Sequence, residues 1–182
     1  MSTRFFTRQL ALYASYHRDR RNRATHFAGI PAIVFSLLVP LALWRFPLGG
    51  LEASAAWIVA GLALAGWIAL DATIGLVMGI VVLPMLLAAE WIAGRFGATV
   101  AWAVFAAFFI GGWVFQLVGH TWEGRRPALA DNLFQAFIGP MFIMAEVLIG
   151  LGLKPDLKAT VEESSDKAEA VASRPPAGQA PV

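Results

Sequence analysis

The sequence predicts an all-α integral membrane protein, a helical bundle with about five spans. Its composition is the first reason: 58% of the 182 residues are hydrophobic and 14% are charged, whereas a soluble domain is usually nearer a quarter charged. The second is that the charged side chains are gathered between apolar runs of about 20 residues, the length that crosses the hydrocarbon core. The third is that the arginines flank those runs, which is typical of residues that set membrane topology. We therefore expect a lipid bilayer, and no nucleic acid, as a partner.

Residues 1–26 form the first predicted segment, and 3–17 within it have the pattern of an amphipathic helix. Four residues recur at the spacing of one helical face: Phe6, Leu10, Tyr13 and His17. Arg4 and Arg8 suit anionic headgroups, so we expect this helix at the membrane surface. The alternative is an ordinary helix packed on the rest of the protein. No long apolar core precedes the first span, so we expect no cleaved signal peptide.

Residues 27–153 form the predicted bundle. Its apolar runs cover roughly 27–44, 53–70, 73–92, 98–118 and 133–151. Short turns are predicted at 46–50 and 94–97. Asp71 leaves so short a connection between the second and third runs that the two form either a tight hairpin or a partly re-entrant element.

Residues 154–182 are rich in Lys, Glu, Ser, Ala and Pro, and we expect this polar tail to be disordered. The basic N-terminal segment predicts a cytoplasmic location for that end. If spans one to four all cross, the polar loop 119–132 returns to the same side. We expect the inner membrane of a bacterium, with all three histidines at the cytoplasmic face.

The three histidines, His17, His26 and His120, all lie in two polar blocks, and this distribution predicts a metal site. His17 and His26 are nine residues apart and would point to opposite sides of one helix, so the chain must bend, in our expectation at residues 18–23. Glu123 follows His120 by three residues and shares its face in a helix. The cysteine-free chain excludes thiolate ligands.

The ligand set permits more than one chemistry. Two histidines and a carboxylate are typical of non-haem Fe(II) oxygenases, and three histidines with a water are typical of zinc hydrolases. Glu123 is either a ligand or an acceptor that orients a ligating histidine. The spacing alone does not choose between these alternatives.

Other polar residues near the histidines are candidates for substrate binding. Arg125 and Arg126 suit a carboxylate or phosphate, or serve only as cytoplasmic anchors. Asn132 and Gln135, together with Tyr16, could bond the site or cap helices. Glu146 lies inside the fifth apolar run, where a carboxylate is costly and marks a candidate functional residue.

Two segments resemble the Mpo1-like membrane proteins. The first holds Tyr16-His17, Asn22, His26 and Gly29-Ile30-Pro31. The second holds Gly112-Trp113, Phe115-Gln116, Gly119-His120, Glu123, Arg125-Arg126-Pro127-Ala128-Leu129, Asp131-Asn132 and Gln135, with Glu146 further on. The resemblance spans residues 13 to about 152.

The resemblance implies an Fe(II)-dependent dioxygenase that removes one carbon from long-chain 2-hydroxy fatty acids by α-oxidation, with O2 as co-substrate. It implies metal and catalytic roles for His17, His26, His120 and Glu123. It also implies substrate contacts from Tyr16, Asn22, Arg125, Arg126, Asn132 and Gln135, and a supporting role for Glu146. The competing hypotheses are a non-enzymatic scaffold or lipid-binding protein, and a zinc-dependent lipid hydrolase.

Overall fold

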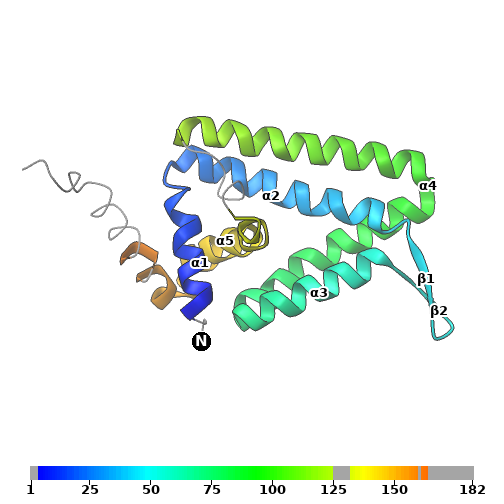
Figure 1. The fold of residues 1–182 in the computed structure, drawn as a ribbon, viewed down its shortest axis with the longest axis horizontal. Helices are drawn as coiled ribbons and strands as arrows, with labels where there is room; N and C mark the ends of the chain where they lie inside the picture. Colours follow the sequence, from blue (N-terminus) through cyan, green and yellow to red (C-terminus); the bar gives the residue numbers. More distant parts are fainter. Residues whose placement is uncertain (1–3, 125–131, 160, 164–182) are drawn as a thin grey trace, which may run out of the picture.

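The computed structural model describes residues 4–124, 132–159 and 161–163, and the fold is mainly helical (Figure 1). The helices are α1 (Arg4–Ser15), α2 (Arg20–Leu41), α3 (Ala55–Leu70), α4 (Ala72–Glu123) and α5 (Phe134–Gly150). Two short strands, β1 (Arg45–Leu48) and β2 (Leu51–Ser54), pair as an antiparallel hairpin between α2 and α3. The predicted turn at 46–50 is therefore a hairpin, in which Gly49 and Gly50 take the positive φ values of 57° and 90° that such a tight turn requires.

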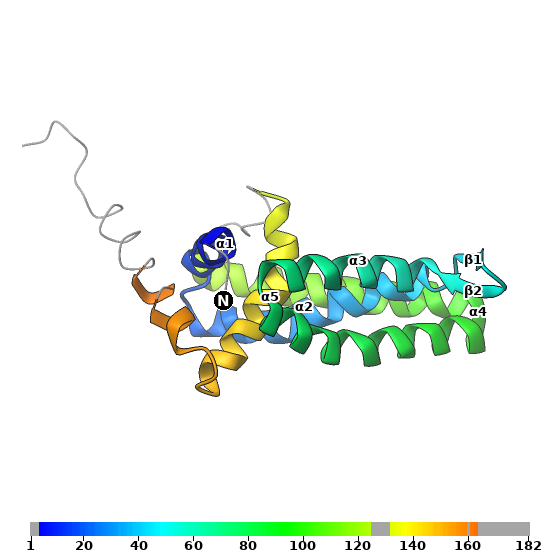
Figure 2. The same cartoon turned by 90° about the horizontal axis from the view of Figure 1, so that it is seen from below.

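The long helices form one elongated bundle, and two helices cover one of its ends. α4 breaks at Gly97, whose φ of 75° and ψ of −174° are not helical, and Figure 1 shows the chain reversing direction there. α2 packs along α4, and α3 also packs on α4. Figure 2 shows α5 running across the long axis of this bundle, near α1. The end of the bundle that holds the N-terminus of α2 is thus capped by α1 and α5.

Two helices, α2 and α4, are long and apolar enough to cross a membrane, and a third candidate is α5 taken together with residues 155–163, which bend away from it by 114°. α3 is apolar but shorter. The predicted third and fourth runs both lie within α4, on either side of Gly97. The protein has the apolar helices of a membrane protein, and the count of five spans stays a prediction.

The contact between α2 and α4 depends on glycines that let the two backbones approach. A Cβ added to Gly29 would lie 2.9 Å from the carbonyl oxygen of Gly112, and one added to Gly119 would collide with Thr25 and Asn22. Small residues of this kind are enriched where helices pack closely in lipid. This packing brings the second half of α4 against the N-terminal half of α2, where the histidines lie.

Helical structure crosses two of the predicted segment boundaries or lies beyond them. α2 begins at Arg20, so His26 belongs to the first long helix and not to a segment that precedes it. The described start of the predicted tail is helical at 155–159 and 161–163. Lys154 donates to the buried Asp71 at 2.9 Å, and Leu157 is only 4% exposed. This part is ordered because it neutralises a buried carboxylate and adds an apolar side chain to the core; residues 164–182 lie outside the described chain.

Candidate metal centre

The four residues predicted to share one face of the N-terminal helix are buried in the structure. Phe6, Leu10, Tyr13 and His17 are all at most 6% exposed. α1 packs against α5, and the Tyr13 ring lies 4.8 Å from that of Phe142. The buried face of α1 therefore packs on protein, which agrees with the alternative of an ordinary helix packed on the rest of the chain. This packing brings His17 into the interior.

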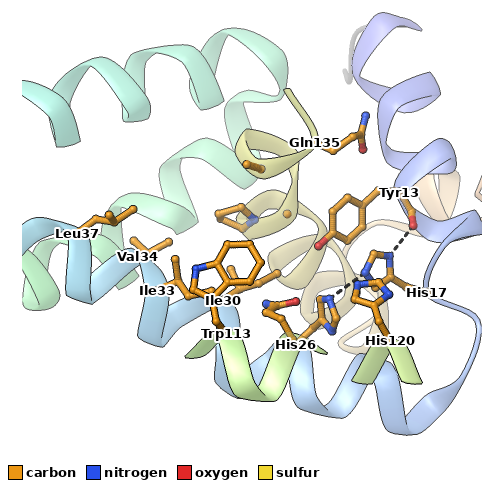
Figure 3. Close-up of a pocket in the computed structure, with 14 residues that line it drawn as sticks. Tyr13, His17, His26, Ile30, Ile33, Val34, Leu37, Trp113, His120 and Gln135 are labelled. Carbon is orange, nitrogen blue, oxygen red and sulfur yellow. Dashed lines mark hydrogen bonds between the residues drawn. The ribbon is translucent and has the colours of Figure 1, made fainter. Parts of the chain in front are cut away.

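His17, His26 and His120 lie together at the capped end of the bundle. Each offers one ring nitrogen, and these nitrogens lie within 4.8 Å of one another (Figure 3). All three side chains are buried. His17 follows α1, His26 lies on α2 and His120 lies near the end of α4, so three separate elements meet at one point. Among the described residues, these three make the group that could hold a metal ion.

The hydrogen bonds of two of these histidines are compatible with a cation between them. The Nδ1 atom of His17 lies 2.7 Å from the carbonyl oxygen of Tyr13, and that of His26 lies 2.8 Å from the carbonyl oxygen of Asn22. A carbonyl oxygen only accepts, so each Nδ1 carries the hydrogen of its neutral ring. The two Nε2 atoms, 3.0 Å apart, then face each other with lone pairs, an arrangement that a shared cation relieves.

The distance between the Nε2 atoms of His17 and His26 fits two ligands of one metal ion. Two imidazole nitrogens bound to one ion at about 2.1 Å and at roughly right angles lie about 3.0 Å apart. Metal-bound histidines commonly donate their other ring N–H to a carbonyl oxygen, which fixes the tautomer and the ring orientation. Burial, reinforced by the neighbouring His26, lowers the pKa of His17 to about 3, so this imidazole is neutral and able to ligate at physiological pH.

The bend that separates His17 from His26 occupies residues 16–19 and overlaps the predicted range 18–23 only at its first two residues. Glu123 stabilises this bend. One carboxylate oxygen of Glu123 accepts a hydrogen bond from the backbone N–H of Arg18 at 2.9 Å. The other accepts from the N–H of Asp19 at 2.9 Å and from the Asn22 side-chain amide at 3.0 Å. These contacts tie Glu123 to the bend between His17 and His26, and its role as a ligand or as an orienting acceptor stays a prediction.

The remaining predicted residues are dispersed. Asn132 is exposed and caps α5 by accepting from the N–H of Phe134 at 2.9 Å. Glu146 pairs with Arg23 at 3.1 Å. The backbone carbonyl of Tyr16 accepts from Asn22 at 3.4 Å. Arg125 and Arg126 lie outside the described residues.

Gln135 lies closer to the site than those residues. It is 1% exposed, lines a cavity shared with the three histidines, and donates to the side-chain oxygen of Gln9 at 2.7 Å. Its own side-chain oxygen is buried and has no hydrogen-bond partner among the described residues.

An apolar pocket of about 160 Å³ leads away from the histidines. Its wall on α2 is made by Ile30, Ile33, Val34 and Leu37, which recur at the spacing of one helical face, and Trp113 of α4 faces them (Figure 3). Leu37 is 45% exposed, so this wall reaches the outer surface of the helices. Gln116 of α4 also lines the pocket. The sequence analysis named Gln116 only as part of the family resemblance and not as a candidate site residue. Its position four residues before His120, on the same helical face, could have indicated that it lies at the site.

A bundle of long apolar helices with a buried three-histidine cluster at the head of an apolar pocket defines a membrane protein with a candidate metal centre for a lipid-like ligand. The chain belongs to the Mpo1-like family: the family described as "2-hydroxy-palmitic acid dioxygenase Mpo1-like" matches residues 3–151. The protein 2-hydroxy-palmitic acid dioxygenase MPO1 of Saccharomyces cerevisiae is 35% identical over 159 residues, which are 85% of this chain and 86% of that protein. No solved structure matches the chain. These findings confirm the resemblance carried by the two histidine-bearing segments.

Proposed function

We propose that this protein is an Fe(II)-dependent dioxygenase that shortens long-chain 2-hydroxy fatty acids by one carbon. The observation that carries the proposal is the pair of facing Nε2 atoms of His17 and His26, 3.0 Å apart, in a buried cluster at the head of an apolar pocket. Membership of a family described by 2-hydroxy-palmitic acid dioxygenase activity supports the substrate class. The sequence resemblance supports Fe(II).

His17, His26 and His120 would hold the metal, and three neutral imidazoles leave coordination positions open. A bound Fe(II) would supply the redox chemistry with O2 that the oxidation of C2 requires. Atom and electron balance fixes the overall reaction. The bond between C1 and C2 breaks, C2 becomes the new carboxyl carbon, and one O2 with one 2-hydroxy acid gives the shortened acid, CO2 and water.

The chain's own residues supply binding, orientation and the exclusion of water. The carbonyl oxygens of Tyr13 and Asn22 hold the rings of His17 and His26 with Nε2 directed inward. The apolar wall from Ile30 to Leu37 suits an alkyl chain, with the polar end of the acid at the histidines. Since Leu37 is partly exposed on an apolar helix, the substrate would enter from the bilayer.

Two features of the proposal come from the sequence alone. Arg125 or Arg126 would neutralise the substrate carboxylate, since an Arg pair next to a metal site suits that anion. The histidine site would face the cytoplasm, since the arginines of residues 1–26 favour that side.

The test is incubation of the purified protein with Fe(II) and 2-hydroxypalmitate, with and without O2, scored for the acid that is one carbon shorter. The proposal predicts product only with both Fe(II) and O2, and none from His120→Ala protein that still inserts into membranes. Stoichiometric zinc in the purified protein, with no shortened acid formed in the presence of O2, would point to the zinc hydrolase, because this cleavage is an oxidation that hydrolysis cannot perform. Purified protein without stoichiometric metal would point to the scaffold.

A further inference from the structure

Two polar side chains that line the apolar pocket have no hydrogen-bond partner among the described residues. They are Tyr13 of α1 and Gln116 of α4, which are 6% and 7% exposed. Neither the Tyr13 hydroxyl nor the Gln116 amide makes a hydrogen bond to another described residue. Because both side chains line the pocket, each group is available to bond a ligand or an ordered water there.

The Tyr13 hydroxyl is held at a defined place. A Cβ added to Gly139 of α5 would lie 3.1 Å from this oxygen and 3.3 Å from Cδ1 of Ile30. Glycine at position 139 thus leaves the space that the hydroxyl occupies. Figure 3 shows the hydroxyl pointing into the pocket, on the side where His26 and Ile30 lie. The Tyr13 ring also stacks on His17, with centroids 4.1 Å apart and an angle of 4°, so the phenol is fixed relative to the metal ligand.

Gln116 approaches the same level of α2 from the other side. Its Nε2 atom lies 3.2 Å from the position of a Cβ added to Gly29. Gly29 and Ile30 follow His26 by three and four residues, which is about one helical turn, or roughly 5 Å along the axis. The hydroxyl and the amide therefore stand between the histidine cluster and the apolar wall formed by Ile33, Val34 and Leu37.

We propose that Tyr13 and Gln116 form a polar subsite that binds the head of the substrate and selects acids with a hydroxyl at C2. This inference rests on the proposed function, because it takes a 2-hydroxy acid as the ligand. An acid whose polar end lies at the histidines and whose chain follows α2 must pass between these two side chains. Tyr13 donates to an oxygen of the carboxylate, and the Gln116 side-chain oxygen accepts the hydrogen of the 2-hydroxyl.

The chemistry of the two groups suits this assignment. The Tyr13 phenol offers one O–H donor, which suits a carboxylate oxygen. An amide supplies both a donor and an acceptor and can satisfy a hydroxyl group. A site built to bond a substrate hydroxyl discriminates strongly against the analogue that lacks it, because its own buried polar groups then stay unpaired.

The test measures binding to iron-free protein, where chelation by the metal contributes nothing. A fluorescent fatty acid bound to the protein in detergent is displaced by adding either 2-hydroxypalmitate or palmitate. The measurement is made on wild-type protein, on the Tyr13→Phe and Gln116→Leu variants, and on the double variant. Tyr13→Phe keeps the carbonyl that orients His17 and the ring that stacks on it, so Fe(II) stoichiometry in parallel samples should be unchanged. Ser36→Ala is the control, since it removes a buried hydroxyl that bonds the Ile33 carbonyl outside the pocket.

Wild-type protein should prefer 2-hydroxypalmitate by about tenfold or more, as expected for a bonded polar group. The Gln116→Leu and double variants should lose that preference while binding palmitate as well as before, and Tyr13→Phe should weaken the binding of both acids. Ser36→Ala should behave as wild type. The inference is overturned if iron-free wild-type protein shows no preference, or if the double variant keeps it, in which case the two groups bind only water. Failure of O2-dependent turnover by iron-loaded wild-type protein would instead overturn the proposed function.

Discussion

The Nε2 atoms of His17 and His26 lie 3.0 Å apart although nine residues separate the two histidines. On a continuous helix this spacing would direct them to opposite sides. The chain brings them together by ending α1 at Ser15 and starting α2 at Arg20, with Asp19 accepting from the N–H of Arg21 as the N-cap. The bend interrupts the helical hydrogen bonds of the backbone, and it brings two candidate metal ligands next to each other.

Metal removal should lower the stability of the wild-type protein. An ion that binds only the folded state at 100 times its dissociation constant adds about 2.7 kcal/mol. We expect iron-loaded protein to show a higher Tm than chelator-treated protein in detergent, and His26→Ala protein to show the same low Tm with or without Fe(II). A chelator effect of equal size on His26→Ala would mean that the metal binds elsewhere.

Glu123→Gln should weaken metal binding without removing a ligand. The substitution replaces one carboxylate oxygen by a donor, which cannot accept from the N–H of Arg18 or Asp19. Loss of groups that orient metal ligands typically costs about 10- to 100-fold in affinity. Titration with Fe(II) measures this change, and the exposed Glu52→Gln is the matched control. Complete loss of binding, equal to that of His120→Ala, would show that Glu123 is itself a ligand.

Gly119→Ala should destabilise the helix pair that holds the site. The added methyl would collide with the Thr25 hydroxyl and the Asn22 side-chain oxygen, and overpacking of this kind costs about 1–3 kcal/mol. Gly111 also lies on α4, but a Cβ added there meets nothing within 4 Å. Gly111→Ala should therefore be neutral, or should stabilise the protein by up to about 1 kcal/mol. Thermal unfolding of both variants in detergent checks the difference, and equal Tm values would contradict the close contact.

The features set by local pattern could be predicted from the sequence, and those set by distant contacts could not. The buried face of α1 follows from apolar residues at helical spacing, which needs no knowledge of its partner. The orientation of the Glu123 side chain depends on hydrogen bonds from backbone N–H groups at the bend, more than 100 residues earlier in the chain. The spacing of residues in the sequence does not indicate these contacts. The orientation of α5 across the bundle is likewise a packing result, since its apolar length alone resembles a span.

The pairing of Lys154 with Asp71 gives a further prediction. Asp71 is almost fully buried, caps α4 through the N–H of Ile74, and accepts from Lys154. Lys154→Met leaves this carboxylate without its cation, and removing one partner of a buried pair costs about 3–5 kcal/mol. Lys158→Met, at a more exposed position, is the control and should change stability by less than about 1 kcal/mol. Limited proteolysis of the 154–163 segment should rise only in Lys154→Met protein.

Substitution of Leu37 should alter the chain length that the pocket accepts. Leu37 lies about 16 Å along α2 from His26, at 1.5 Å per residue, and forms the outer end of the apolar wall. Leu37→Trp adds bulk where the far part of a long alkyl chain would lie, while the histidines and the polar subsite stay intact.

We therefore expect kcat/KM for 2-hydroxypalmitate to fall by about tenfold or more in Leu37→Trp protein, and kcat/KM for 2-hydroxyoctanoate to stay within about twofold of wild type, because a short chain ends before the new side chain. Leu62→Trp on α3, 70% exposed and outside the pocket lining, should leave both values unchanged. Equal losses for the two acids in Leu37→Trp protein would place the acyl chain along a different path from the histidines.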